Sequence, residues 1–104
     1  MITIPVPIFP QSDSDLVERT IEAACRAAGL TITLKSSLSK FPGALHWHLK
    51  QGPQPGSLEL TYWPARQQMW LTIRPNRGAP WVEAAAEQLN ADLQMRFQVD
   101  VGVA

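Results

Sequence analysis

The sequence has very little cysteine and no long apolar run. Cys25 is the one cysteine among 104 residues, which excludes an internal disulfide and any zinc site built from cysteines alone. No apolar stretch approaches the roughly 20 residues of a membrane-spanning helix. The first residues lack the positive start and the apolar stretch of a signal peptide. We therefore expect a cytoplasmic protein, with no membrane as a partner.

The sequence also lacks net charge, because nine basic side chains balance nine acidic ones. Most nucleic-acid-binding domains are strongly basic, so this balance argues against a nucleic-acid partner. The charge is unevenly distributed, however: residues 1–30 carry −2, residues 31–77 carry +5 and residues 78–104 carry −3. The cations are therefore concentrated in the middle of the chain.

Two segments have the pattern of amphipathic helices. Residues 13–28 begin with polar capping residues, carry apolar residues three and four positions apart, and end before Gly29. Residues 79–94 contain Pro80 near the first helical position and place Trp81 on an apolar face. We expect both helices to cover the same face of a sheet.

Segments between and outside the helices alternate apolar and polar residues, as strands do. Residues 2–8 alternate, but their prolines restrict them to an edge strand or an extended arm. Four strands are expected between the helices, with a loop that contains residues 40–43 and a short hairpin loop at 64–67, and a last strand is expected after the second helix. These five predicted strands cover residues 31–35, 45–50, 58–63, 69–74 and 97–103.

The resulting order is β-α-β-β-β-β-α-β, and it predicts an α+β fold in one domain, residues 1–104. We expect a two-layer sandwich: an antiparallel four-stranded meander, extended by edge strands from the N- and C-terminal segments, with two helices packed on one face. The length and the apolar content of 45% suit a single globular domain.

The faces of the strands can also be predicted, because opposite residues of antiparallel strands point the same way. The pairs expected on the helix-covered face are all apolar. They are Tyr62 with Met69, Leu60 with Leu71, Leu58 with Ile73, Leu49 with Leu58, Trp47 with Leu60, Leu45 with Tyr62, Leu34 with Trp47 and Ile32 with Leu49.

The opposite face of the sheet, which we call the outer face, is predicted to be basic and aromatic. Its expected side chains are Thr33, Lys35, His46, His48, Lys50, Glu59, Thr61, Trp63, Trp70, Thr72 and Arg74. A solvated sheet face usually carries small polar and charged residues, so two tryptophans and two histidines here indicate a binding surface.

The candidate ligand- or interface-binding residues are Trp63, Trp70, Lys35, Lys50 and Arg74. Our first hypothesis is a non-catalytic domain that acts through protein association, as a homodimer, because tryptophan is enriched in interface cores. The alternative is a module that binds a ligand, a nucleic acid or a metal on this face. In that case the tryptophans would stack on an aromatic group and the cations would hold an anion.

The candidate metal ligands are His46, His48 and Glu59. Two histidines at positions i and i+2 of a strand emerge on one face, about 6.6 Å apart along it. Glu59 is expected opposite His48, and three such ligands plus water suit zinc. The other interpretation is that Glu59 only pairs with His48 or Lys50.

No motif in the sequence predicts catalysis. Cys25 lies on the apolar stripe of the first helix, where cysteine is usually an inert small side chain. A Gly-x-Ser-x-Gly elbow and a glycine-rich phosphate loop are both missing. We therefore expect a protein that is not an enzyme and that needs no cofactor.

Overall fold

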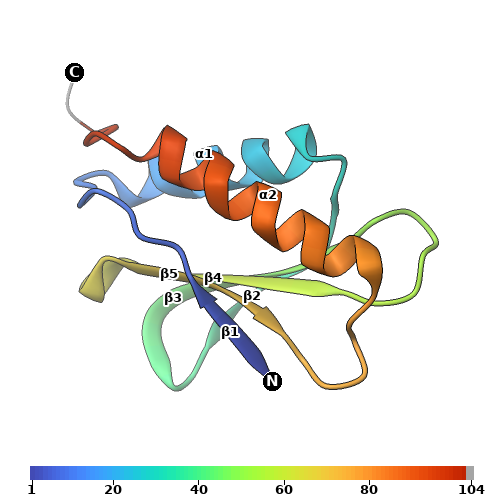
Figure 1. The fold of residues 1–104 in the computed structure, drawn as a ribbon. Coiled ribbons are helices and arrows are strands. Elements are labelled where there is room, and N and C mark those ends of the chain that lie inside the picture. The colour runs from blue at the N-terminus through green and yellow to red at the C-terminus, as the bar shows by residue number, and fades with distance from the viewer. Residues whose placement is uncertain (103–104) are drawn as a thin grey trace.

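The computed structural model describes residues 1–102 and has one five-stranded antiparallel sheet with two helices on one face (Figure 1). The sheet order is β1-β5-β4-β3-β2, so β1 and β2 form the two edges. The predicted α+β class is confirmed, and the predicted order of elements is confirmed through the second helix. The elements are β1 (Ile2–Pro5), α1 (Ser14–Ala27), β2 (Thr31–Leu38), β3 (Phe41–Lys50), β4 (Leu58–Trp63), the 3-10 turn η1 (Pro64–Arg66), β5 (Gln68–Ile73) and α2 (Pro80–Arg96).

Both helices begin and end where the local sequence favours it. Asp13 is the N-cap of α1, and its carboxylate accepts a hydrogen bond of 3.1 Å from the amide of Leu16. Gly29 follows the helix with a φ of 75°, in the left-handed region that glycine adopts without strain. Pro80 occupies the first position of α2, where its missing N–H is not needed. Within residues 1–102, neither helix is long and apolar enough to cross a membrane.

The apolar core fills the space between the helices and the sheet. The register of β3, β4 and β5 is the predicted one: Trp47 pairs with Leu60, and Leu60 pairs with Leu71. These side chains are fully buried beneath the helices. The largest fully buried side chains are Trp47, Tyr62, Phe97, Ile21, Leu49, Leu58, Leu60, Leu71, Leu89 and Leu93.

The edge strand β2 departs from the predicted register. Ile32 pairs with Leu49 as expected, but Leu34 pairs with His48 instead of Trp47, because a β-bulge at Thr33 inserts one extra residue. A shift of one residue reverses the faces of all later side chains. Leu34 is therefore 49% exposed on the outer face, and Lys35 points to the helices, where it forms ion pairs with Glu18 and Glu22 of α1.

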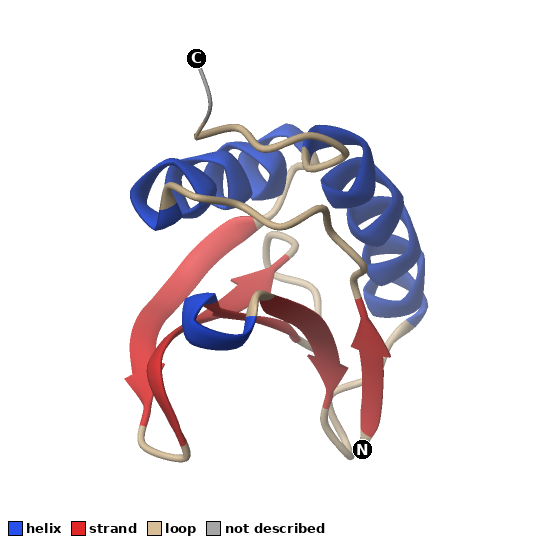
Figure 2. Ribbon diagram, turned by 90° about the vertical axis from the view of Figure 1, so that its left-hand side faces the viewer, coloured by secondary structure: helices blue, strands red, loops and turns tan. Residues whose placement is uncertain are grey.

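The predicted loop at 40–43 is also wrong in extent. β2 continues to Leu38 and β3 begins at Phe41, so only Ser39 and Lys40 form the turn between them. A second register irregularity lies between Ser37 and Leu38. The sheet is curved around its outer face, as Figure 2 shows, and this hairpin lines one side of the resulting hollow.

The predicted C-terminal strand is absent over residues 97–102, which form turns; residue 103 lies outside the described residues. The backbone there bonds to a side chain instead of a strand. The Gln11 carboxamide accepts from the amide of Val101 and donates to the carbonyl of Val99, both at 2.7 Å. The apolar residues that alternate in this segment do not share a buried face, because Phe97 is fully buried and Val99 is 61% exposed.

Candidate functional site

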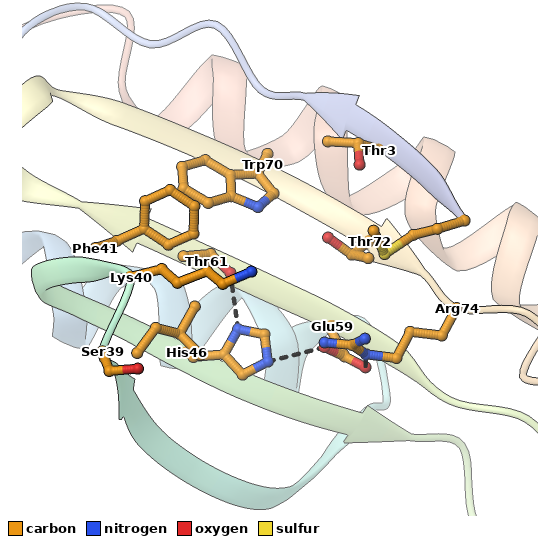
Figure 3. A pocket seen from close by; sticks show the side chains of 12 residues that line it. Thr3, Ser39, Lys40, Phe41, His46, Glu59, Thr61, Trp70, Thr72 and Arg74 are labelled. Atoms are coloured by element: carbon orange, nitrogen blue, oxygen red, sulfur yellow. Dashed lines mark hydrogen bonds and ion pairs between the residues drawn. The ribbon is translucent and has the colours of Figure 1, made fainter.

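The outer face is hollowed into a cavity of about 600 Å³, which we call the outer-face pocket (Figure 3). All five strands contribute to it, although they are distant in sequence. Phe41 and Trp70 lie at one end, Glu59 and Arg74 at the other, and His46 lies between them. The lining residues are Met1, Thr3, Leu38, Ser39, Lys40, Phe41, His46, Glu59, Thr61, Trp70, Thr72 and Arg74.

The floor of the pocket is a buried network of polar side chains. His46 is 5% exposed and Glu59 is 3% exposed. Nδ1 of His46 lies 2.7 Å from Oγ1 of Thr61, and Nε2 lies 2.9 Å from Oε1 of Glu59. Nε of Arg74 donates a hydrogen bond of 2.7 Å to Oε2 of Glu59. Each buried polar group therefore has a partner, and a guanidinium balances the buried carboxylate.

Burial lowers the pKa of His46 from its ordinary 6.5, although the nearby Glu59 carboxylate acts in the opposite direction. His46 is therefore neutral at pH 7 and carries one ring proton. In this network Nε2–H donates to Glu59, and the hydroxyl of Thr61 donates to Nδ1. The imidazole is thus held in one orientation from both sides.

The apolar end of the pocket is a cluster of three aromatic rings. The ring of Phe41 packs edge-on against Trp63 at 5.0 Å and against Trp70 at 5.2 Å. Trp63 does not reach the pocket. Its indole N–H donates to the carbonyl of Pro42 at 3.0 Å, and the guanidinium of Arg66 lies 5.6 Å from its ring. Trp63 therefore supports Phe41, whereas Phe41 and Trp70 form the wall.

The predicted binding residues divide into two groups. Trp70 and Arg74 lie on the outer face and line the pocket. Trp63, Lys35 and Lys50 do not line the pocket. Lys35 lies on the helix face because of the bulge, and the ammonium of Lys50 donates to the carbonyl of Gly56 at 2.6 Å.

Sequence reasoning missed Phe41 and Lys40, which line the pocket from the β2–β3 hairpin. Pro42 and Gly43 follow Phe41, and Gly43 has a φ of 83°. This irregular backbone prevents alternation from assigning Phe41 to either face. An apolar residue inside a predicted polar loop was the one signal available.

The three predicted metal ligands are close together. His48 lies opposite Glu59 in the register, with its Nε2 3.9 Å from Oε1 of Glu59. The rings of His46 and His48 are 5.0 Å apart, nearly perpendicular. One ligand atom from each of His46, His48 and Glu59 lies within 4.8 Å of the other two.

Two other features carry less specific chemistry. A hollow of about 810 Å³ lies between β1, β5 and α2, but its lining includes no charged residue. Cys25 is fully buried on the inner face of α1, and burial raises the pKa of its thiol to about 12. Its thiolate is therefore scarce at neutral pH, which removes it as a nucleophile.

Comparison of the chain with protein-family models, with curated proteins and with solved structures found no match. The function must therefore be argued from the outer-face pocket itself. This pocket combines an aromatic wall, a buried neutral imidazole and a cationic end, and such a combination suits recognition of a small polar molecule that has an apolar part.

Proposed function

We propose that this domain binds a small anionic ligand with a planar apolar part in the outer-face pocket. The observation that carries the proposal is that buried His46 and Glu59 pair with each other and with the exposed Arg74, in a cavity whose wall is Phe41 and Trp70. Buried polar groups cost free energy unless they are fully paired. Their position at the floor of a cavity, not inside the core, supports a binding role over a purely structural one.

The charges of the pocket favour an anion. Arg74 balances Glu59, which leaves Lys40 as surplus positive charge among the lining residues. The side chain of Arg74 is 54% exposed, and Nε makes its hydrogen bond to Glu59. The terminal N–H groups of the guanidinium can therefore donate to a carboxylate or phosphate, which Arg binds in a two-pronged geometry.

The aromatic wall favours a planar group beside the anion. Phe41 and Trp70 are half-buried and fixed edge-to-face, so their remaining surface is rigid. Stacking on such a ring contributes about 1–3 kcal/mol in single-stranded nucleic acid complexes. The cavity of about 600 Å³ has the volume of a small-molecule site, for which the usual range is about 300–1,000 Å³.

A matched pair of probes tests this proposal. Benzoate and benzamide have nearly the same shape, but only benzoate is an anion. Isothermal titration should detect benzoate binding and much weaker benzamide binding, and Arg74→Gln should abolish the preference for benzoate. Arg77→Gln is the control, because Arg77 is exposed nearby in sequence and lies outside the pocket.

Equal binding of the two probes, or an unchanged preference in Arg74→Gln, would contradict the proposal. Benzoate binding should also change the tryptophan fluorescence of the native chain. Loss of that change in Trp70→Phe would support the assignment of Trp70 to the aromatic wall.

A second candidate function is association of two copies through the outer face. Met1 and Leu34 are exposed apolar side chains on this face, Leu34 because of the bulge. Against it, Trp63 and Trp70 are half-buried around Phe41 and offer less free surface than an interface anchor. Light scattering distinguishes the two: a dimer that becomes a folded monomer in Leu34→Ser or Trp70→Ser would favour association.

A further inference from the structure

A second arrangement lies at the Glu59 and Arg74 end of the outer-face pocket. It is centred on one oxygen of Glu59 and includes His48, which is not among the lining residues of the pocket. Oε1 lies 2.9 Å from Nε2 of His46 and 3.9 Å from Nε2 of His48. In a tetrahedral zinc site the metal–ligand distances are about 2.0–2.2 Å, which puts neighbouring ligand atoms about 3.3–3.5 Å apart. The two observed separations lie on either side of this value, so small side-chain rotations can bring all three atoms to one ion.

The other atoms of these side chains are already held by outer partners. Arg74 binds Oε2 of Glu59, so Oε1 is the oxygen that would bind an ion, in place of the hydrogen bond that it accepts from Nε2 of His46. Thr61 contacts Nδ1 of His46, which leaves Nε2 as the ligand atom. A metal-binding histidine usually donates its second ring N–H to such a partner, because this fixes the ring and its tautomer.

We propose that Nε2 of His46, Nε2 of His48 and Oε1 of Glu59 bind one divalent zinc-type cation and leave a fourth position for water or an anion. Two imidazole nitrogens select zinc-type transition metals over magnesium and calcium, which prefer oxygen ligands. On binding, His46 keeps its single ring proton but carries it on Nδ1, where it donates to the hydroxyl of Thr61. No proton is lost from this ring.

The surrounding charge determines what occupies the fourth position. A divalent cation beside the Arg74–Glu59 pair adds positive charge to this end of the pocket. An anion bound to the metal would offset that charge, and it would occupy the same cavity as the ligand proposed above. This last step rests on the proposed function, whereas binding of the metal itself does not.

Zinc titration of the full chain, in buffer without carboxylate or phosphate, tests the metal site alone. Calorimetry should show one zinc ion per chain, and both imidazole NMR signals should shift; with two histidines in the sequence, single variants assign each signal. His48→Ala is the main variant, because its side chain is 35% exposed and its loss should leave the fold intact. Thr31→Ala, at an exposed position of the neighbouring strand β2, is the control.

Removal of an outer partner of a metal ligand costs about 10–100-fold in affinity, so removal of a direct ligand should cost more. We expect His48→Ala and Glu59→Gln each to exceed that loss, and Thr31→Ala to bind zinc like the native chain. Circular dichroism verifies folding, and His48→Gln replaces His48→Ala if the latter unfolds.

Failure of the native chain to bind stoichiometric zinc, or zinc binding unchanged in His48→Ala and Glu59→Gln, would overturn the metal site. Benzoate titration of the chain after chelator treatment separates the two proposals. Benzoate binding without zinc binding would remove the metal site and leave the anion pocket, and zinc binding without benzoate binding would do the reverse.

Discussion

At the scale of single residues, two neighbouring residues of β4 lie on opposite faces of the sheet, in different environments. Thr61 faces the outer-face pocket and bonds to His46, whereas Tyr62 faces the helices and is fully buried. The hydroxyl of Tyr62 makes no hydrogen bond of normal geometry among the described residues, although the side chain of Gln67 lies close to it. A buried hydroxyl without a partner costs free energy, so the aromatic ring stabilises the core and the hydroxyl opposes it.

Replacement of Tyr62 by Phe should therefore not destabilise the protein. We expect the free energy of unfolding to stay the same or to rise by about 1 kcal/mol, since the ring remains and the unpaired hydroxyl is removed. Thr61→Val is the matched comparison on the next residue, and it should destabilise by about 1–3 kcal/mol because it leaves Nδ1 of His46 without a donor. Urea denaturation measures both. Clear destabilisation by Tyr62→Phe would mean that the hydroxyl has a partner, such as a buried water.

At the scale of elements, the bulge in β2 connects the sheet to α1. It turns Lys35 toward the helix, where the ammonium bonds to the carboxylates of Glu18 and Glu22. The indole N–H of Trp47 donates to the same Glu22 carboxylate at 3.0 Å. Glu22 of α1 therefore bonds to side chains of both the edge strand β2 and the neighbouring strand β3.

This junction should make stability depend on acid pH. Burial alone would raise the pKa of Glu22, but hydrogen bonds from Lys35 and Trp47 outweigh it and bring the pKa below the ordinary 4.5. A carboxyl whose pKa is lower in the folded state stabilises the fold above pH 4.5, and this contribution is lost as the pH falls through the folded value. Glu22→Gln should thus be less stable than the native chain at pH 7, and the difference should shrink toward pH 3.

Thermal unfolding at pH 7, 5, 4 and 3 measures this difference. Glu87→Gln, at an exposed position of α2, is the control and should reproduce the native pH profile. A Glu22→Gln deficit that is equally large at pH 3 would show that the carboxylate charge is not the cause.

The contact of Lys35 with α1 also shows which parts of the sheet could be predicted from the sequence and which could not. Alternation predicted the register of β3, β4 and β5 correctly, because their inward residues are all large and apolar and only one register buries them together. β2 is different. Thr31 to Lys35 alternates equally well with or without a bulge, and Leu34 is apolar, so burial alone favoured the wrong register. The decisive interaction is between Lys35 and α1, which lies 13 or more residues earlier and is invisible to a strand pattern.

The candidate site was predictable to a similar extent. His46, His48 and Glu59 were assigned to one face because they sit on regular strands, and the structure brings them together. Phe41 and Lys40 were not, because curvature of the sheet and the irregular hairpin place them over the pocket. Such curvature arises from bulges and long-range packing, which local periodicity does not encode.

At the scale of the whole molecule, one side chain joins the segments at the two ends of the described chain. Gln11 is nearly fully buried between β1 and α1. Its carboxamide donates to the carbonyls of Phe9 and Val99 and accepts from the amide of Val101. These bonds replace the backbone hydrogen bonds that a C-terminal strand would have made. They hold the turns after α2 against the N-terminal segment.

Gln11→Ala should therefore loosen the C-terminal turns before it affects the sheet. Loss of a buried partner leaves the carbonyl of Val99 and the amide of Val101 unpaired, at a cost of about 1–3 kcal/mol in unfolding free energy. Hydrogen exchange should show a large acceleration at the Val101 amide. The amides of β4 should accelerate only as far as the loss of global stability requires. Gln88→Ala, exposed on α2, should change neither. Unchanged protection of Val101 in Gln11→Ala would mean that the turns are held by Phe97 and the contact of Ser12 with Asp100 alone.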